Sequence, residues 1–307
     1  MGTPIKFSVI VETYNLKEGS DWDRFRASLG AATAMIPEDR SAEVLVADAY
    51  GSLELEKMLA EEFPQVPRVA ATGLSYDRAK AMAAQAASGH YVLFLDGDCI
   101  PDPNWHHRLL EVLRSGEAVA CGGYIRYEGG FLAAIMSVMD FGFLYPRVAR
   151  ELKCYASNSC GFLRETLEEV PVPEADMRCC CYYHAQLLLR RGTPVRLVPE
   201  AVALHALPPI IMERSRQGYD AIAACWADPK LPEARWLRTG ILSLPLFYTM
   251  KVLLDWKRVW IGRKDLELSP WQVLLSLPLF PLFRLLDAAG MVRAFTRGPT
   301  KGGWGGF

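Results

Sequence analysis

Three largely apolar runs in the first hundred residues are each followed by an acidic residue, and they constrain the fold most. They are Phe7–Val11 before Glu12, Glu43–Ala47 before Asp48, and Tyr91–Leu95 before Asp96. Such runs suit strands that are covered on both faces. Helices are predicted between and after them, at Trp22–Ala34, Leu53–Glu62, Asp77–Ala87 and Asn104–Ser115. This alternation predicts an α/β fold, with a mostly parallel sheet flanked by helices.

The acids that follow these strands are expected at one edge of the sheet. In parallel sheets ligands bind at the carboxyl ends of the strands, where Glu12, Asp48 and Asp96 would meet. Asp98 follows Asp96 after a single glycine, and Lys80 belongs to the helix before that strand. Two aspartates at i and i+2 can also cap a turn, so the pair alone leaves both interpretations open. The convergence of other charges at the same edge favours a ligand site.

The second half of the chain is less regular and contains two very apolar stretches. Strands are predicted at Val119–Tyr127 and Pro194–Val198, and a helix at Tyr182–Arg191. The stretches 237–254 and 271–291 approach the length of a membrane span, but both contain proline and charged residues. Basic residues and tryptophans between them favour the headgroup zone of an anionic leaflet. We therefore expect helices that lie in the interface or re-enter it, with a buried helical subdomain or a homodimer face as the alternative.

Composition narrows the class of protein. For 307 residues we expect a catalytic domain over 1–225, followed by membrane-associated helices and a flexible tail over 226–307. The formal net charge of −1 gives no basic excess that would favour nucleic acid. The first fifteen residues lack the apolar core of a signal peptide, which predicts a cytoplasmic location and free thiols for the eight cysteines.

The ordered motifs resemble those of a known family. SVIVETYN, VLVADAYGS and AKAMAAQAASGHYVLFLDGDCIPDPNW, within residues 6–115, are similar to the family 2 glycosyltransferases, and the likeness continues more loosely to His205. The resemblance implies a GT-A fold, Rossmann-like, with a nucleotide-binding half at 1–115 and an acceptor half at 116–225. It also implies a glycosyltransferase, of the hexosyltransferase type, that uses a nucleotide-sugar donor.

The resemblance assigns donor-binding roles to residues of the first half. Glu12 and Asp48 would hold the nucleobase, usually uracil, and Lys80 would contact the nucleotide. Asp96 would contact the ribose or the metal, and Tyr14 belongs to the same donor-binding set. Glu12 stands where proline is more usual, and Lys80 where arginine is common.

The DxD motif, Asp96-Gly97-Asp98, implies a divalent metal. A diphosphate leaving group gains negative charge as the glycosidic bond breaks, and Mg²⁺ or Mn²⁺ bound through carboxylates and phosphates stabilises it. By resemblance Asp98 is the metal ligand, and His205 is a second ligand or a diphosphate contact. Asn158 would line the sugar pocket. Arg216, with Arg214, could meet the diphosphate, although a solvated charged helix face explains these arginines equally well.

The catalytic base is the role for which this sequence lacks the family's usual residues. Inverting transfer needs a group that takes the proton of the acceptor hydroxyl. The family commonly supplies it from an acidic pair about a dozen residues before the glycine of the last strand, here Gly192. That count falls on Cys180 and Cys181, and Asp176 is the nearby candidate base. A metal site at Cys180 and His184, which share a helical face, is disfavoured against simple packing because no second ligand pair exists.

The sequence thus predicts a metal-dependent, inverting glycosyltransferase of a bacterial membrane-associated type. It would move a sugar from a UDP-sugar to a lipid or polyprenyl-linked acceptor at the cytoplasmic face of the cell membrane, as a peripheral or re-entrant protein. Two alternatives stay open. One is a nucleotidyltransferase acting on a sugar phosphate, although ETYNLKEGS lacks a basic, glycine-rich phosphate loop. The other is a non-catalytic relative that binds the nucleotide sugar.

Overall fold

The computed structural model describes residues 6–17, 21–39, 41–173, 180–227, 234 and 240–297. The chain divides into two compact units, and each is described by itself. Unit 1 comprises 1–125, 148–175 and 180–206, and unit 2 comprises 126–147, 176–179 and the chain from 207 onwards. The predicted boundary of the catalytic domain at residue 225 stays a prediction.

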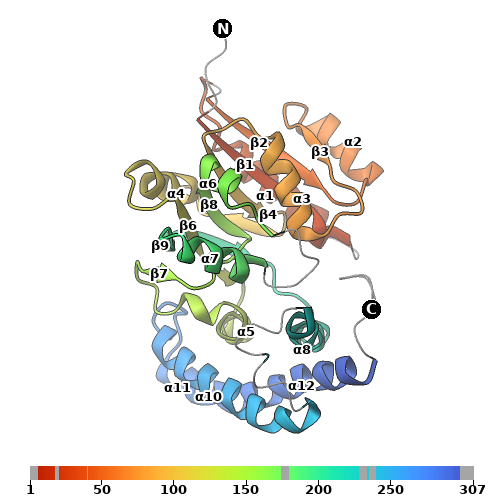
Figure 1. The fold of residues 1–307 in the computed structure, drawn as a ribbon, viewed down its shortest axis with the longest axis vertical. Coiled ribbons are helices and arrows are strands. Elements are labelled where there is room, and N and C mark those ends of the chain that lie inside the picture. The colour runs from red at the N-terminus through yellow and green to blue at the C-terminus, as the bar shows by residue number, and fades with distance from the viewer. Residues whose placement is uncertain are drawn as a thin grey trace. The chain divides into compact units, whose positions relative to one another are not determined.

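Unit 1 is organised around one mixed sheet, drawn mostly in red to green in Figure 1. Its strand order is β3-β2-β1-β4-β8-β6-β9-β5, and β7 pairs with β9. The strands are β1 (Phe7–Glu12), β2 (Ala42–Asp48), β3 (Arg68–Ala70), β4 (Tyr91–Asp96), β5 (Cys99–Pro101), β6 (Ala120–Tyr127), β7 (Glu151–Leu152), β8 (Ser159–Leu163) and β9 (Val195–His205). Strands β3, β2, β1 and β4 are parallel, and β8 runs antiparallel to β4 and β6.

Five helices lie where the sequence predicts them, within one or two residues. They are α1 (Trp22–Thr33), α2 (Leu53–Glu62), α3 (Tyr76–Ala86), α4 (Trp105–Arg114) and α7 (Cys180–Arg190). The short helix α6 (Arg164–Glu169) and the 3₁₀ turn η1 (Tyr14–Lys17) were not predicted. Side-chain caps at Asp21 and Ser52 begin α1 and α2. Helix α4 buries Leu109, Leu110 and Leu113, which recur at helical spacing. The predicted α/β fold is confirmed.

The short strands β5 and β7 were not predicted, and β8 and β9 differ from the prediction for reasons of tertiary structure. β8 was not predicted, because the polar residues of YASNSCGF are typical of a turn. It forms a strand because it pairs with β4 on one side and with β6 on the other. In addition, Trp105 Nε1 donates to Ser159 Oγ at 2.9 Å. β9 is longer than predicted and extends to His205, where it pairs with β5.

Unit 2 is helical. Its elements are α5 (Phe131–Phe141), η2 (Gly142–Leu144), α8 (Ile210–Ala227), η3 (Gly240–Ser243), α10 (Leu244–Gly262), α11 (Pro270–Ser276) and α12 (Leu279–Arg297) (Figure 1). Helices α8 and α12 pack with their backbones close together. A side chain at Gly218 would place its Cβ 1.8 Å from the Asp287 carbonyl oxygen, so glycine is required there.

A network of buried charges lies inside unit 2. The Arg284 guanidinium donates to both oxygens of Asp255, at 2.7 and 2.9 Å, and to Asp287 at 2.5 Å. Arg214 donates to Asp140 and lies 3.7 Å from an Asp287 oxygen. Removing one partner of such a network is costly because it leaves another charge buried without compensation. The network therefore holds α8, α10 and α12 in one arrangement.

Candidate active site

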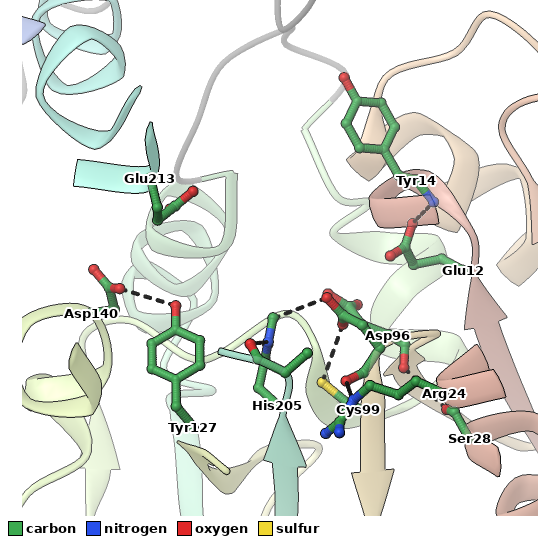
Figure 2. Close-up of polar contacts among 12 residues, drawn as sticks. Glu12, Tyr14, Arg24, Ser28, Asp96, Cys99, Tyr127, Asp140, His205 and Glu213 are labelled. Carbon is green, nitrogen blue, oxygen red and sulfur yellow. Dashed lines mark hydrogen bonds and ion pairs between the residues drawn. The ribbon is translucent and has the colours of Figure 1, made fainter. Parts of the chain in front are cut away.

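The acids at the ends of the parallel strands meet at one edge of the sheet. The register of β1 and β4 places Glu12 opposite Asp96, and that of β1 and β2 places it opposite Ala47, next to Asp48. The Glu12, Asp48 and Asp96 side chains are buried, and Asp98 is half-buried. Figure 2 shows Glu12, Asp96 and His205 at this edge. We call it the rim, defined by Glu12, Asp48, Asp96, Asp98 and His205.

Gly97 lets the chain turn between the two aspartates of the rim. A Cβ atom there would lie 2.5 Å from the Phe25 ring and 2.6 Å from the Glu12 carbonyl oxygen. The Gly97 amide donates to that carbonyl at 3.0 Å. Close packing against β1 therefore requires glycine at this position.

Asp96 is held by a clamp of Tyr76, Lys80 and the loop before β8. Lys80 Nζ lies 2.5 Å from one carboxylate oxygen, and the Tyr76 hydroxyl lies 2.7 and 2.9 Å from the two oxygens. Lys80 also donates to the Ser157 carbonyl at 2.8 Å. Burial opposes the charge of Lys80, but the Asp96 and Glu12 carboxylates more than offset it and raise the pKa of Lys80. The Asp96 carboxylate is thus oriented by two side chains of α3.

Glu12 is a buried carboxyl that lies close to a second buried carboxylate, that of Asp96. One oxygen accepts from the Tyr14 amide at 2.6 Å (Figure 2). The other oxygen is buried and has no hydrogen-bond partner among the described residues. Burial, and then the charge of Asp96, raises the pKa of Glu12 well above its ordinary value. A protonated Glu12 would be able to donate a hydrogen bond to a ligand at the rim.

Asp98 and His205 face each other on the other side of the rim. His205 Nε2 lies 3.6 Å from Asp98 Oδ2, and the two side chains are 13% and 19% exposed. His205 Nδ1 lies 2.7 Å from the Ala206 carbonyl oxygen, to which it donates. Because Nδ1 donates to that carbonyl, Nε2 is the ring nitrogen that faces Asp98, an arrangement also found in histidines that bind metals.

The backbone holds Asp98 and His205 together. In the antiparallel pair of β5 and β9, Cys99 is opposite His205, and the Ala206 amide donates to the Asp98 carbonyl at 3.1 Å. Arg24 of α1 crosses between them: Nε donates to the Asp98 carbonyl at 2.6 Å and Nη2 to the Leu204 carbonyl at 2.8 Å. Sequence reasoning missed Arg24, whose side chain positions both candidate ligands through their backbone.

The residues present fit a hard divalent ion. Ligand atoms of Asp98, Cys99 and His205 lie within 4.8 Å of one another. Burial raises the pKa of the Cys99 thiol well above its ordinary value, so the thiol stays protonated and is a poor ligand. Asp98 and His205 remain as the protein's oxygen and nitrogen donors. A set of only two protein ligands suits Mg²⁺ or Mn²⁺, because these ions usually bind phosphate and water oxygens at their remaining coordination positions.

On the other side of Glu12 the loops carry polar and aromatic groups. Asp48 Oδ1 accepts from the Tyr50 and Gly51 amides at 2.9 and 3.0 Å, and Oδ2 lies 2.8 Å from Arg68 Nε. The ring centroids of Tyr14 and Tyr50 are 6.0 Å apart. Asp48 thus shapes its own loop and pairs with Arg68, while its contact with a nucleobase stays a prediction.

The candidate site residues from the second half of the chain lie in different units of the structure. Asn158 is buried in unit 1, its carbonyl accepts from the Asp96 amide at 3.4 Å, and its side-chain oxygen has no hydrogen-bond partner among the described residues. Arg216 belongs to unit 2 and pairs with Glu213 at 2.6 Å. Arg214 is a buried member of the network with Asp140, which assigns it a structural role rather than a diphosphate contact.

Asp176, the candidate base, lies outside the described residues. The structure draws attention to a different carboxyl, Asp77, in the first turn of α3 three residues before Lys80. Burial raises the pKa of Asp77 to about 6, although Lys80 and a hydrogen bond from Cys180 oppose the shift. By the resemblance, the family's acidic pair falls on Cys180 and Cys181, and Asp77 brings a carboxyl next to Cys180 from another element. Sequence spacing could not reveal a contact between α3 and α7.

His184 has a structural role. Its Nδ1 lies 2.8 Å from the Tyr155 hydroxyl, and its Nε2 lies 2.7 Å from the Val170 carbonyl oxygen. Burial lowers the pKa of His184 to about 4, which keeps the ring neutral. Both ring nitrogens are engaged, which agrees with packing rather than metal binding at Cys180 and His184.

Comparisons with known proteins agree with this architecture. A mouse (Mus musculus) protein, polypeptide N-acetylgalactosaminyltransferase 12, is 30% identical over 122 residues, or 38% of this chain. The match covers 20% of that relative, so the chain corresponds to about a fifth of its length.

Two solved structures share the fold. The mannosyltransferase PcManGT from Pyrobaculum calidifontis, in complex with GDP-Man and Mn²⁺, has a TM-score of 0.60 at 16% identity and covers 94% of this chain and 86% of its own. GalNAc-T7 with UDP, GalNAc and Mn²⁺ has a TM-score of 0.52 at 13% identity and covers 66% of this chain and 44% of its own. These matches confirm the predicted GT-A fold class.

The family assignment rests on the sequence match. The model of glycosyl transferase family 2 covers residues 8–170, which is more than half of the chain and includes β1, β4 and both rim aspartates of the DxD motif. The chain therefore belongs to glycosyl transferase family 2.

Proposed function

We propose that this protein is a metal-dependent glycosyltransferase that takes its sugar from a nucleoside-diphosphate donor, in particular a UDP-sugar. The observation that carries the proposal is the pairing of Asp98 and His205 beside an Asp96 already oriented by Tyr76 and Lys80. The fold neighbours support a nucleotide-sugar donor and Mn²⁺, since they were solved with UDP or GDP-Man and with Mn²⁺.

The metal-side chemistry follows from the ligands. Bound Mg²⁺ or Mn²⁺, held by Asp98 and His205, would neutralise the charge that grows on the leaving diphosphate. Arg24 keeps the two ligands in place, and His205 turns Nε2 toward Asp98. Asp96 accepts from the donor's ribose, and Glu12 supplies a second polar group near it. Asp48 and Tyr14 border the nucleobase, with Asn158 toward the sugar, and the contact of Arg216 with the diphosphate stays a prediction from the sequence.

The transfer proposed is inverting, by one displacement at the anomeric carbon. The acceptor oxygen forms the new bond to that carbon as the bond to the phosphate oxygen breaks, and the acceptor proton moves to a carboxylate of the enzyme. Asp176 is one candidate for this base and Asp77 is the other. A base with a pKa of about 6 is largely ionised at neutral pH and still accepts a proton well.

The two candidate bases are separated by their pH profiles. We expect Asp77→Asn to lower kcat by about 10²–10⁴-fold and to remove the acidic limb near pH 6, if Asp77 is the base. Asp176→Asn would then keep that limb. The reverse pattern would assign the role to Asp176, and a limb retained in both variants would remove both from the mechanism.

The acceptor proposed is a lipid or polyprenyl-linked molecule at the cytoplasmic face of the cell membrane. Support comes from unit 2, where one described stretch, Pro270–Arg297, is long and apolar enough to cross a membrane by composition alone. A homodimer that covers this stretch is the alternative.

Product analysis tests the proposal. The full-length protein is incubated with Mn²⁺, a panel of UDP- and GDP-sugars, and a polyprenyl phosphate. Glycosyl transfer predicts release of the nucleoside diphosphate together with a glycosylated lipid. Release of pyrophosphate would instead indicate a nucleotidyltransferase, and donor binding without any turnover would indicate a non-catalytic relative.

A further inference from the structure

The exposed face of α10 is an apolar stripe. Leu246, Leu253, Trp256 and Trp260 are exposed, Leu246 and Trp260 by 57% each. Their spacing of three, four and seven residues places them along one side of the helix. Asp255, the only acid of α10, is on the opposite side and fully buried. Helix α10 thus turns its apolar face outward and its acid inward.

Helices α11 and α12 continue the same pattern. Their exposed side chains are Trp271, Leu274, Leu275, Leu282, Leu285 and Val292, with Trp271 exposed by 66%. These positions also recur at helical spacing, across the break between the two helices. Arg284, one residue before Leu285, and Asp287, two residues after it, point away from this surface and are buried. Because α10 and α12 pack together (Figure 1), Asp255 and Arg284 form an ion pair between them.

This distribution is the inverse of that of a water-soluble helical bundle. More than half of the exposed large apolar side chains among the described residues lie between 240 and 297, which is less than a fifth of the chain. The exposed charged residues of α10–α12 are basic, Lys257 and Arg297, and the turn between α10 and α11 carries one exposed base, Lys264, and one exposed acid, Glu267. Exposed apolar surface of this extent marks an interaction site, and its cationic residues select an anionic partner.

We propose that the outward face of α10, α11 and α12 is a lipid-binding surface that lies in the headgroup zone of an anionic bilayer. We call it the lipid face, defined by Leu246, Leu253, Trp260, Trp271, Leu285 and Lys257. The lipid face depends on the proposed function only in its link to a lipid acceptor, because a protein can bind a bilayer without transferring a sugar. Tryptophan and lysine both favour the boundary between hydrocarbon and headgroups.

The ion pair between α10 and α12 favours this placement over a membrane span. If α12 crossed the bilayer, Arg284 would lie near its middle, and its partner Asp255 would fix α10 at the same depth. The exposed Lys257, two residues beyond Asp255, would then lie in hydrocarbon, which is costly. In the interface, the same lysine reaches anionic headgroups while the apolar stripe is buried at the acyl boundary.

Charge also disfavours a second copy of the chain as the occupant. In a two-fold dimer the same patch meets itself, so Lys257 of one lipid face would lie against the equally basic lipid face of the other copy. The described residues of α10–α12 contain no exposed acid, and the exposed acid of the turn after α10, Glu267, lies 3.8 Å from Arg126. Anionic headgroups supply the charge that a second copy lacks, at about 1 kcal/mol for each basic residue near the surface.

Vesicle co-sedimentation of the full-length protein tests the lipid face. Phosphatidylcholine vesicles are compared with vesicles that also contain phosphatidylglycerol, at low and high salt. The wild type is expected to partition at least about tenfold more strongly to the anionic vesicles, with a loss of that preference at high salt. Leu253→Ser/Trp260→Ser and Lys257→Glu/Lys264→Glu are each expected to weaken the partition at least about tenfold. Bound protein is expected to be released by alkaline carbonate.

The matched controls lie on α2, in unit 1. Leu53 is 82% exposed, and Lys57 is also exposed on the same helix, so Leu53→Ser and Lys57→Glu change similar surface without touching the lipid face. They are expected to bind vesicles as the wild type does. Circular dichroism melts check that every variant folds.

Several results would overturn the lipid face. One is equal binding of wild type and lipid-face variants, and another is equal binding to neutral and anionic vesicles. Retention through carbonate extraction would indicate a span instead. If light scattering showed that Leu253→Ser/Trp260→Ser converts a dimer to a monomer with unchanged vesicle binding, a second copy would be the occupant. Sugar transfer to a water-soluble acceptor is measured separately, so loss of vesicle binding cannot be confused with loss of catalysis.

Discussion

The protein buries charge in two places, the rim of unit 1 and the network of unit 2, and the two differ in how the charges balance. In unit 2, three arginines (Arg214, Arg258 and Arg284) face three aspartates (Asp140, Asp255 and Asp287). At the rim, Lys80 pairs with Asp96 and Arg68 pairs with Asp48, while the carboxyls of Glu12 and Asp98 lie at the same edge of the sheet.

The difference shows which kind of buried charge indicates a ligand. In a balanced network each buried charge has a partner within the protein, so helix packing explains why the charges are buried. At the rim, a buried oxygen of Glu12 has no hydrogen-bond partner among the described residues, and such a group is completed by a cation or by a polar ligand. Burial of charge alone does not separate the two cases, since Arg214 is as buried as Lys80.

Asp98→Asn should have the largest effect. Because it removes the carboxylate proposed to hold the metal, we expect kcat for sugar transfer to fall by about 10³-fold or more. The release of nucleoside diphosphate measures it. Asp102→Asn, at an exposed acid just after β5, is the control and should transfer sugar at the wild-type rate; an equal loss in both variants would contradict the role of Asp98.

Lys80→Met and Arg284→Met sharpen the comparison of the two regions. Each leaves a buried carboxylate without its partner, so each should lower the free energy of unfolding by about 3–5 kcal/mol in urea denaturation. Only Lys80→Met should also abolish binding of the nucleotide, measured by calorimetry under conditions where both variants are folded. Loss of nucleotide binding in Arg284→Met would show that the network of unit 2 is part of the donor site.

His205→Gln and His184→Gln form a smaller, matched pair. His205→Gln should weaken the apparent affinity for Mn²⁺ by about 10–100-fold, because a metal ligand of fixed tautomer is lost. His184→Gln removes bonds to Tyr155 and Val170, so it should lower thermal stability and leave the Mn²⁺ dependence unchanged. Identical metal titrations of the two variants would argue against His205 as a ligand.

Glu12→Gln should have the smallest effect, visible in the pH dependence of stability. The pKa of Glu12 is raised in the folded protein, mainly by burial. Between the unfolded and folded pKa values the folded state keeps a proton that the unfolded chain releases, so stability falls as pH rises through that range, by up to about 1.4 kcal/mol per pH unit. Urea denaturation as a function of pH should show a flatter curve for Glu12→Gln; an unchanged curve would mean that Glu12 is ionised.

The sequence predicted the rim because its acids follow strands whose apolar runs are unmistakable. It could not predict the contacts that depend on register and helix packing. The ion pair of Asp48 with Arg68 follows from the pairing of β2 with β3, and the bond between Asp77 and Cys180 follows from the approach of α3 to α7. Likewise, the burial of Arg214 depends on the packing of α8 against α12.

The central claim is that Asp98 and His205 bind the metal that joins the donor to the rim. Isothermal titration of UDP into the wild type and Asp98→Asn, with and without Mn²⁺, tests it most directly. We predict that Mn²⁺ strengthens UDP binding to the wild type at least about tenfold and leaves binding to Asp98→Asn unchanged. An equal effect of Mn²⁺ on UDP binding in the two proteins would contradict the claim.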